Sequence, residues 1–162
     1  NIMRVIFLDV DGVLNSRQGR ESRERNGSFS AFSLEADHLK LLKKIVDATD
    51  AKIVLSSSWR YRFWDDKIAH LKEGPLYYAL CAHLSKYGMQ LYDVTPYIRY
   101  DVTRGDEIRA WLNMNQGIER FVILDDENDF YASQLEDYLV QVSSETGLTE
   151  DDCSKAINKL TK

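Results

Sequence analysis

Three short apolar runs constrain the fold of this chain more than any other feature of its sequence. Residues 4–9, 51–56 and 120–125 each combine β-branched and other apolar residues almost without interruption. Such continuous runs are typical of strands that are buried on both faces, as in a parallel sheet. Amphipathic segments lie between them. The alternation predicts an α/β domain of three layers, with helices on both faces of the sheet.

Capping signals and helical periodicity predict the remaining elements. We expect a helix over 34–48, capped by Ser33, with Leu39, Leu42 and Val46 on its buried face. Pro75 suits the first turn of a second helix, which Gly88 ends. Further helices are predicted to begin after Thr103 and Thr149, and further strands at 89–94 and 138–142.

Composition excludes several classes of protein. A chain of 162 residues forms one domain, and 44% hydrophobic residues supply a core without any apolar run near the length of a membrane span. The net charge of −5 excludes a basic coat for nucleic acid but leaves room for a local basic patch. Cys81 and Cys153 form no CxxC pair, and no HExxH occurs. We therefore expect a cytoplasmic protein without a disulfide framework or a zinc site.

Acidic residues follow two of the predicted strands. Asp9 and Asp11 come at the end of the first, and Asp125, Asp126 and Asp129 follow the run at 120–125. The carboxyl ends of parallel strands share one edge of the sheet, where α/β folds bind their ligands. Carboxylates gathered there repel one another unless a cation lies between them, and Mg2+ prefers oxygen ligands. The pattern predicts a magnesium site, in which a structural role for Asp126 is as consistent as a metal-binding one.

The residue types around this edge suit phosphoryl transfer. A carboxylate can attack phosphorus, and a second acid two residues on can protonate the leaving oxygen and later activate water. Ser56 and Ser57 end the second strand with hydroxyls suited to a phosphate oxygen, and Arg104 at a helix start can hold phosphoryl oxygens. Single Asp residues are common in turns, but this whole set in this order is rare by chance.

The stretch Asp-Val-Asp-Gly-Val-Leu-Asn from Asp9, with the later serine and acids, resembles the haloacid dehalogenase (HAD) superfamily of phosphohydrolases. The resemblance implies that Asp9 is the nucleophile. It implies that Asp11 is the general acid/base and that its backbone carbonyl binds Mg2+. Ser56, with Ser57 as the less favoured alternative, and Arg104 would bind the phosphate.

The same resemblance implies that Asp125 is a direct metal ligand. Asp129 fits the spacing of the outer acid, and Asp126 is the other candidate for that place. An acid at the position of Asp11 is similar to that of phosphatases and phosphotransferases in the superfamily, rather than dehalogenases or transport ATPases.

Four longer stretches narrow the resemblance further. They are the motif at Asp9, Leu-Ser-Ser-Ser-Trp-Arg, Asp-Val-Thr-Pro and Arg-Gly-Asp-Glu-Ile-Arg-Ala-Trp-Leu. Together they resemble the HAD domain of bacterial and phage RNA-repair proteins, which is assigned to end processing of nucleic acid. The implied fold is one Rossmann-like HAD domain over residues 1–162, with a central five-stranded parallel sheet and only a small flap.

The segment 15–33 lacks an apolar period and is predicted to be that flap, an irregular loop too short for a separate cap domain. An open site of this kind can admit a large substrate. Arg17 and Arg20 make the flap locally basic, and Arg60 follows the second strand among aromatic residues. We expect these three arginines to contact substrate and Trp59 to pack in the core. The opposite hypothesis, that the arginines only pair with acids on a solvated face, stays open.

Three hypotheses for function result. The first is a Mg2+-dependent phosphatase acting on RNA or DNA ends or on nucleotides, and the second is the same chemistry on a small metabolite or a phosphoprotein. The third is a non-catalytic nucleic-acid-binding module that keeps the fold. We expect a phosphorylated substrate, no membrane association and no obligate protein partner.

Overall fold

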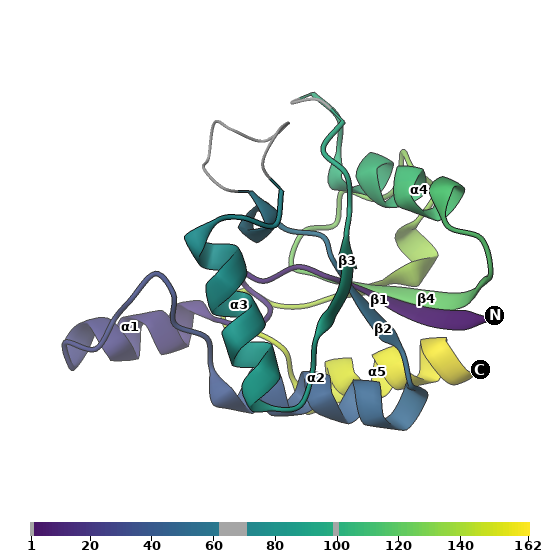
Figure 1. Cartoon of the computed structure of the whole chain (residues 1–162). Coiled ribbons are helices and arrows are strands. Elements are labelled where there is room, and N and C mark those ends of the chain that lie inside the picture. The colour runs from purple at the N-terminus through teal and green to yellow at the C-terminus, as the bar shows by residue number, and fades with distance from the viewer. Residues whose placement is uncertain (1, 62–70, 99–100) are drawn as a thin grey trace.

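A computed structural model describes residues 2–61, 71–98 and 101–162 of the chain. Its centre is a five-stranded sheet with strand order β3-β2-β1-β4-β5 (Figure 1). All four neighbouring pairs of strands are parallel, as the continuous apolar runs predict. The strands are β1 (Met3–Leu8), β2 (Lys52–Leu55), β3 (Leu91–Val94), β4 (Ile118–Asp125) and β5 (Leu139–Gln141).

Helices cover both faces of this sheet, so the three-layer α/β architecture is confirmed (Figure 1). α2, α3 and α5 share one apolar cluster, and α4 belongs to the other. None of the helices in the described parts of the chain has the length and apolar composition needed to cross a bilayer. The helices are α1 (Arg17–Arg25), α2 (Ala36–Thr49), α3 (Pro75–Lys86), α4 (Arg104–Met114) and α5 (Glu150–Thr161), with short 3-10 turns η1 (Ser58–Arg60) and η2 (Glu136–Tyr138).

Alternate residues of β1 explain the two clusters. Ile6 and Leu8 face the cluster that contains α2, α3 and α5, whereas Val5 and Phe7 face the cluster that contains α4. All four side chains are fully buried. The Phe7 ring meets the edge of Trp111 of α4 at a centroid distance of 5.4 Å. Because the central strand is buried on both faces, its sequence contains no polar alternation.

Most predicted boundaries agree with the structure. Pro75 occupies the first turn of α3, and Gly88, with a φ of 74°, follows the end of that helix. Thr103 and Thr149 each cap a helix through a reciprocal capping box.

The predicted cap of α2 is wrong. The helix begins at Ala36 with Glu35 as its N-cap, and Ser33 lies outside it. The carboxylate of Glu35 accepts hydrogen bonds from both the backbone amide and the hydroxyl of Ser16, so it joins two segments instead of capping its own helix.

The flap is also more regular than expected. Its first half forms α1, whereas we predicted an irregular loop over 15–33. Ser16 caps this helix by accepting a hydrogen bond from the amide of Gly19. Ion pairs one turn apart support it further, and no residue of α1 is buried. A helix held by a cap and by charge pairs needs no apolar face, which is why periodicity did not reveal it.

A polar junction around Glu35 helps to tie the flap to the core. The carboxylate of Glu35 contacts Ser16 at the start of α1. It also lies 3.5 Å from Nη1 of Arg23 within that helix. Its other neighbour is His38 of α2, whose Nε2 lies 3.1 Å from a Glu35 oxygen and whose Nδ1 lies 2.8 Å from the carbonyl oxygen of Leu148. Both ring nitrogens face acceptors, so the imidazole satisfies both contacts only when it carries two protons.

This junction predicts a pH dependence of stability. Burial lowers the pKa of His38, but the hydrogen bond and charge of Glu35 outweigh burial and raise that pKa above its usual 6.5. The stabilising contribution of His38 is therefore complete below about pH 6.5 and is lost as the pH rises through the higher pKa of the folded state. Urea unfolding over this range should show stability falling with pH.

The variant His38→Gln should flatten that part of the pH profile. His83→Gln is the matched control, because among the described residues Nε2 of His83 faces the backbone carbonyl of Phe32 and not a carboxylate. If the stability of His38→Gln falls with pH as steeply as that of the wild-type protein, the junction is not the cause of the pH dependence.

Candidate active site

The site lies at the carboxyl edge of the sheet, where three strand ends bring polar residues together. Asp9 directly follows β1, Ser56 follows β2, and Asp125 ends β4. The ladder continues one residue past the strands, since the amide of Asp9 donates to the carbonyl of Leu124 at 2.9 Å and that of Ser56 to the carbonyl of Leu8 at 2.8 Å. The backbone positions of these residues are therefore fixed by the sheet itself.

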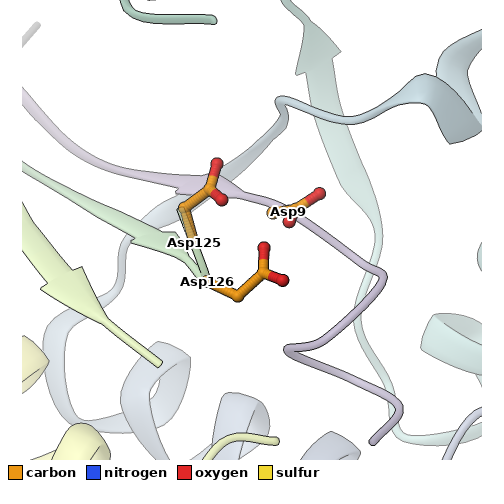
Figure 2. A group of neighbouring side chains, drawn as sticks. All are labelled: Asp9, Asp125 and Asp126. Carbon is orange, nitrogen blue, oxygen red and sulfur yellow. The ribbon is translucent and has the colours of Figure 1, made fainter. Parts of the chain in front are cut away.

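Three carboxylates converge at this edge. One oxygen from each of Asp9, Asp125 and Asp126 lies within 4.8 Å of the others, and the three side chains point into the same space (Figure 2). Asp9 is 4% exposed and Asp125 is fully buried. Carboxylate oxygens from two buried acids and the half-buried Asp126 form a donor set that a hard divalent cation such as Mg2+ prefers. The cluster could thus hold such an ion.

Of the two candidates for the outer acid, the structure brings in Asp126 and not Asp129. Asp126 contributes an oxygen to the cluster, whereas Asp129 is exposed and lies outside this group of described residues. Gly12 makes room for this arrangement, since its φ is +84° and an added Cβ would lie 2.6 Å from a carboxylate oxygen of Asp126. Glycine is required there both by backbone conformation and by space.

Arg104 joins the cluster from the first turn of α4, as predicted. Its Nη1 lies 2.9 Å from Asp9 and 3.1 Å from Asp125. Burial alone would lower the pKa of this guanidinium, but the two carboxylates raise it above its usual value. Arg104 is therefore a permanent positive charge between two buried acids.

The acids themselves are under electrostatic strain. Burial, and next the charge of Asp125, raise the pKa of Asp9 well above its usual value, although Arg104 opposes the shift. Burial also raises the pKa of Asp125, against the effects of Arg104 and of the backbone amide of Glu127. One guanidinium does not offset the cost of burying this much negative charge, and a bound cation would reduce that cost.

Asp11 lies apart from the cluster and is held by two donors. Asn15 Nδ2 donates to one of its carboxylate oxygens at 2.9 Å, and Trp59 Nε1 donates to the other at 3.1 Å. From the sequence we expected only packing of Trp59 and no role for Asn15. Trp59 is 1% exposed and does pack, but it also orients Asp11. Asn15 could have been found from the sequence, because it ends the opening motif and stands four residues after Asp11.

The two serines after β2 differ in their hydrogen bonding. Ser56 is 1% exposed, and its hydroxyl is one of the buried polar atoms without a hydrogen-bond partner in the described part of the chain. Ser57 instead accepts a hydrogen bond from the backbone amide of Trp59 and caps η1. An unpartnered buried hydroxyl is costly unless a ligand completes it, which favours Ser56 over Ser57 as a phosphate contact.

Arg60 does not face the site opening. Its side chain is 1% exposed, and its guanidinium pairs with Glu107 of α4 at 2.7 Å and donates to the carbonyl of Ser57. This placement argues against Arg60 as a substrate contact, because the residue links η1 to α4 inside the fold. Arg62, Phe63 and Trp64, the next basic and aromatic residues of this stretch, lie outside the described residues.

Arg17 and Arg20 lie on α1 and line a cavity of about 730 Å3 that also includes Asp11 and Asp126. Both arginines are exposed and already paired with acids, Arg17 with Glu145 at 2.9 Å and Arg20 with Glu24 at 3.0 Å. The flap therefore borders the same cavity as the acidic edge of the sheet.

The chain was compared with known proteins. A family model described as the HAD domain in Swiss Army Knife RNA repair proteins matches residues 5–153. The chain belongs to this family. Searches of curated proteins and of solved structures found no match. Membership makes this a HAD-type hydrolase domain, and the five-stranded parallel sheet is the Rossmann-like HAD fold expected from the motifs. HAD domains generally use Mg2+, in keeping with the cluster of three acids.

The cluster predicts stabilisation by metal. Adding Mg2+ at about a hundred times its dissociation constant should raise the melting temperature of this HAD domain by about 5–10 °C, since only the folded state brings the acids together. Asp126→Asn should reduce the rise, whereas Asp129→Asn, the matched control, should retain it. A rise lost in Asp129→Asn and kept in Asp126→Asn would reassign the outer acid.

Proposed function

We propose that this HAD domain is a Mg2+-dependent phosphatase that removes a phosphomonoester from a nucleic-acid end through an aspartyl-phosphate intermediate. The observation that carries the proposal is the grouping of Asp9 with Arg104, Asp125 and Asp126 at the end of the sheet. A nucleophilic carboxylate, a fixed cation and a metal-binding set lie within a few ångströms of one another there.

Each residue has a chemical task in this proposal. Asp9 attacks phosphorus through a carboxylate oxygen, and the bond between phosphorus and the leaving oxygen breaks. Arg104 and Ser56 bind the phosphoryl oxygens, the first through its charge and the second through its otherwise unpartnered hydroxyl. A bound Mg2+, held by Asp9, Asp125 and Asp126 together with the backbone carbonyl of Asp11, would neutralise charge between the carboxylate and the phosphate.

Asp11 completes both half-reactions. It gives its proton to the leaving oxygen as the aspartyl phosphate forms. It then takes a proton from water, which attacks phosphorus, and the bond from phosphorus to Asp9 breaks to release inorganic phosphate. The hydrogen bonds from Asn15 and Trp59 hold the carboxylate of Asp11 in one orientation for these transfers.

Two features support a nucleic-acid end as the substrate. The matched family is described by its presence in RNA repair proteins. The cavity beside Asp11 also has arginines on its flap side, where a negatively charged chain can be bound.

The nucleophile can be tested directly. Asp9→Asn should abolish Mg2+-dependent phosphate release from phosphorylated RNA and DNA oligonucleotides. Asp11→Asn should slow it about 10²- to 10⁴-fold, the usual contribution of a general acid/base. The control is Asp129→Asn, which leaves the cluster intact. Phosphate release by Asp9→Asn at an appreciable fraction of the normal rate would contradict its role.

The two serines provide a second test. Ser56→Ala removes a buried hydroxyl without a protein partner, so it should weaken phosphate binding about ten-fold while the melting temperature stays equal or rises. Ser57→Ala removes the cap of η1, so it should lower the melting temperature and have a smaller effect on phosphate binding. Inhibition by inorganic phosphate and thermal unfolding measure the two effects. The reverse pattern would assign the phosphate contact to Ser57.

A further inference from the structure

The cavity beside Asp11 is distinct from the place where phosphorus would react. Its lining includes Asp11 and Asp126 on the side of the sheet and Arg20 and Phe29 on the side of the flap. Asp9, Ser56 and Arg104, all in the described part of the chain, are outside that lining. At about 730 Å3 the cavity has the size of a site for a small organic group.

The chemistry identifies what must enter this cavity. On the proposed function, on which this step rests, Asp11 protonates the oxygen that leaves phosphorus. The leaving group therefore lies on the side of Asp11. The carboxylate of Asp11 borders the cavity. When phosphate is removed from the end of a nucleic acid, the leaving oxygen belongs to the terminal nucleoside, so that nucleoside is the group that the cavity receives.

The flap offers a surface that suits a base. The Arg20 guanidinium lies over the ring of Phe29 at 4.8 Å from the ring centroid. Phe29 is 42% exposed although it is a large apolar residue. Unpaired bases stack on aromatic rings and on guanidinium planes.

The charges on the flap are available to a substrate. Arg20 pairs with Glu24, and the two side chains are 63% and 49% exposed. Arg17 pairs with Glu21 and with Glu145 in similarly exposed contacts. Exposed pairs of this kind contribute little to stability, so a phosphate of the chain can replace the carboxylate partner at low cost.

We infer that the cavity is a nucleoside site, in which the base of the phosphorylated terminal residue of an RNA stacks on the Arg20–Phe29 pair. Phe29 is then a specificity residue that distinguishes an end with a base from other phosphomonoesters. The site adds to the phosphoryl-binding residues, and the two side chains on which the base stacks both come from the flap.

The test compares RNA oligonucleotides whose phosphorylated terminal residue either carries a base or is abasic, with the phosphate at the 3′ end and at the 5′ end in separate arms. The wild-type protein should hydrolyse the end with a base with a kcat/KM about ten-fold higher than the abasic end, in at least one arm. Phe29→Leu should bring this ratio close to one.

Phe32→Leu is the matched control, because Phe32 belongs to the same connection between α1 and α2, is 45% exposed and is outside the lining of the cavity. It should retain the wild-type ratio. Equal kcat/KM values for the two ends, or a preference that survives in Phe29→Leu, would overturn the nucleoside site and leave the proposed phosphatase standing.

Binding measured without turnover separates the two proposals. Fluorescence anisotropy of labelled oligonucleotides with Asp9→Asn should show tighter binding of the end with a base, and the added change Phe29→Leu should remove the difference. If the binding preference is found but the wild-type protein releases no phosphate, the nucleoside site is supported and the proposed phosphatase is overturned. Equal binding of both ends would overturn the nucleoside site.

Discussion

Arg104 contacts both Asp9 and Asp125, and the geometry of the site depends on this shared contact. The two acids end neighbouring parallel strands, so the sheet brings them together whatever their charges are. Burial makes the ionised form of both carboxylates energetically unfavourable, as their raised pKa values indicate. A single guanidinium at the start of α4 reduces that cost, and the negative charge that remains favours the binding of a cation.

The position of Arg104 has its own structural support. The capping box at Thr103 fixes where α4 begins. The ion pair between Arg60 and Glu107 then ties the same helix to η1, directly after the strand that carries Ser56. Arg104 and Ser56, which would hold phosphoryl oxygens, are thereby linked through a buried ion pair. A shift of α4 would therefore also strain the turn after β2.

The sequence predicted those parts of the molecule that repeat general rules of α/β folds. Continuous apolar runs identified β1, β2 and β4, and parallel topology then required that Asp9, Ser56 and Asp125 meet at one edge. The choice between Asp126 and Asp129 could not be made from spacing, because it depends on the close approach of Asp126 to Gly12. The role of Trp59 was hidden for a similar reason, since its contact with Asp11 spans 48 residues of sequence. The burial of Arg60 could not be predicted, because exposure is not visible in a basic and aromatic stretch.

The helix α1 buries none of its residues and is joined to the core through the polar contacts of Ser16 and Arg23 with Glu35 (Figure 1). Folding therefore places few demands on the amino acids along its exposed length. Natural variation can change the outer surface of this helix without first acquiring compensating mutations in the hydrophobic interior. The acidic edge of the sheet and the outer surface of α1 can consequently evolve at different rates within one small domain.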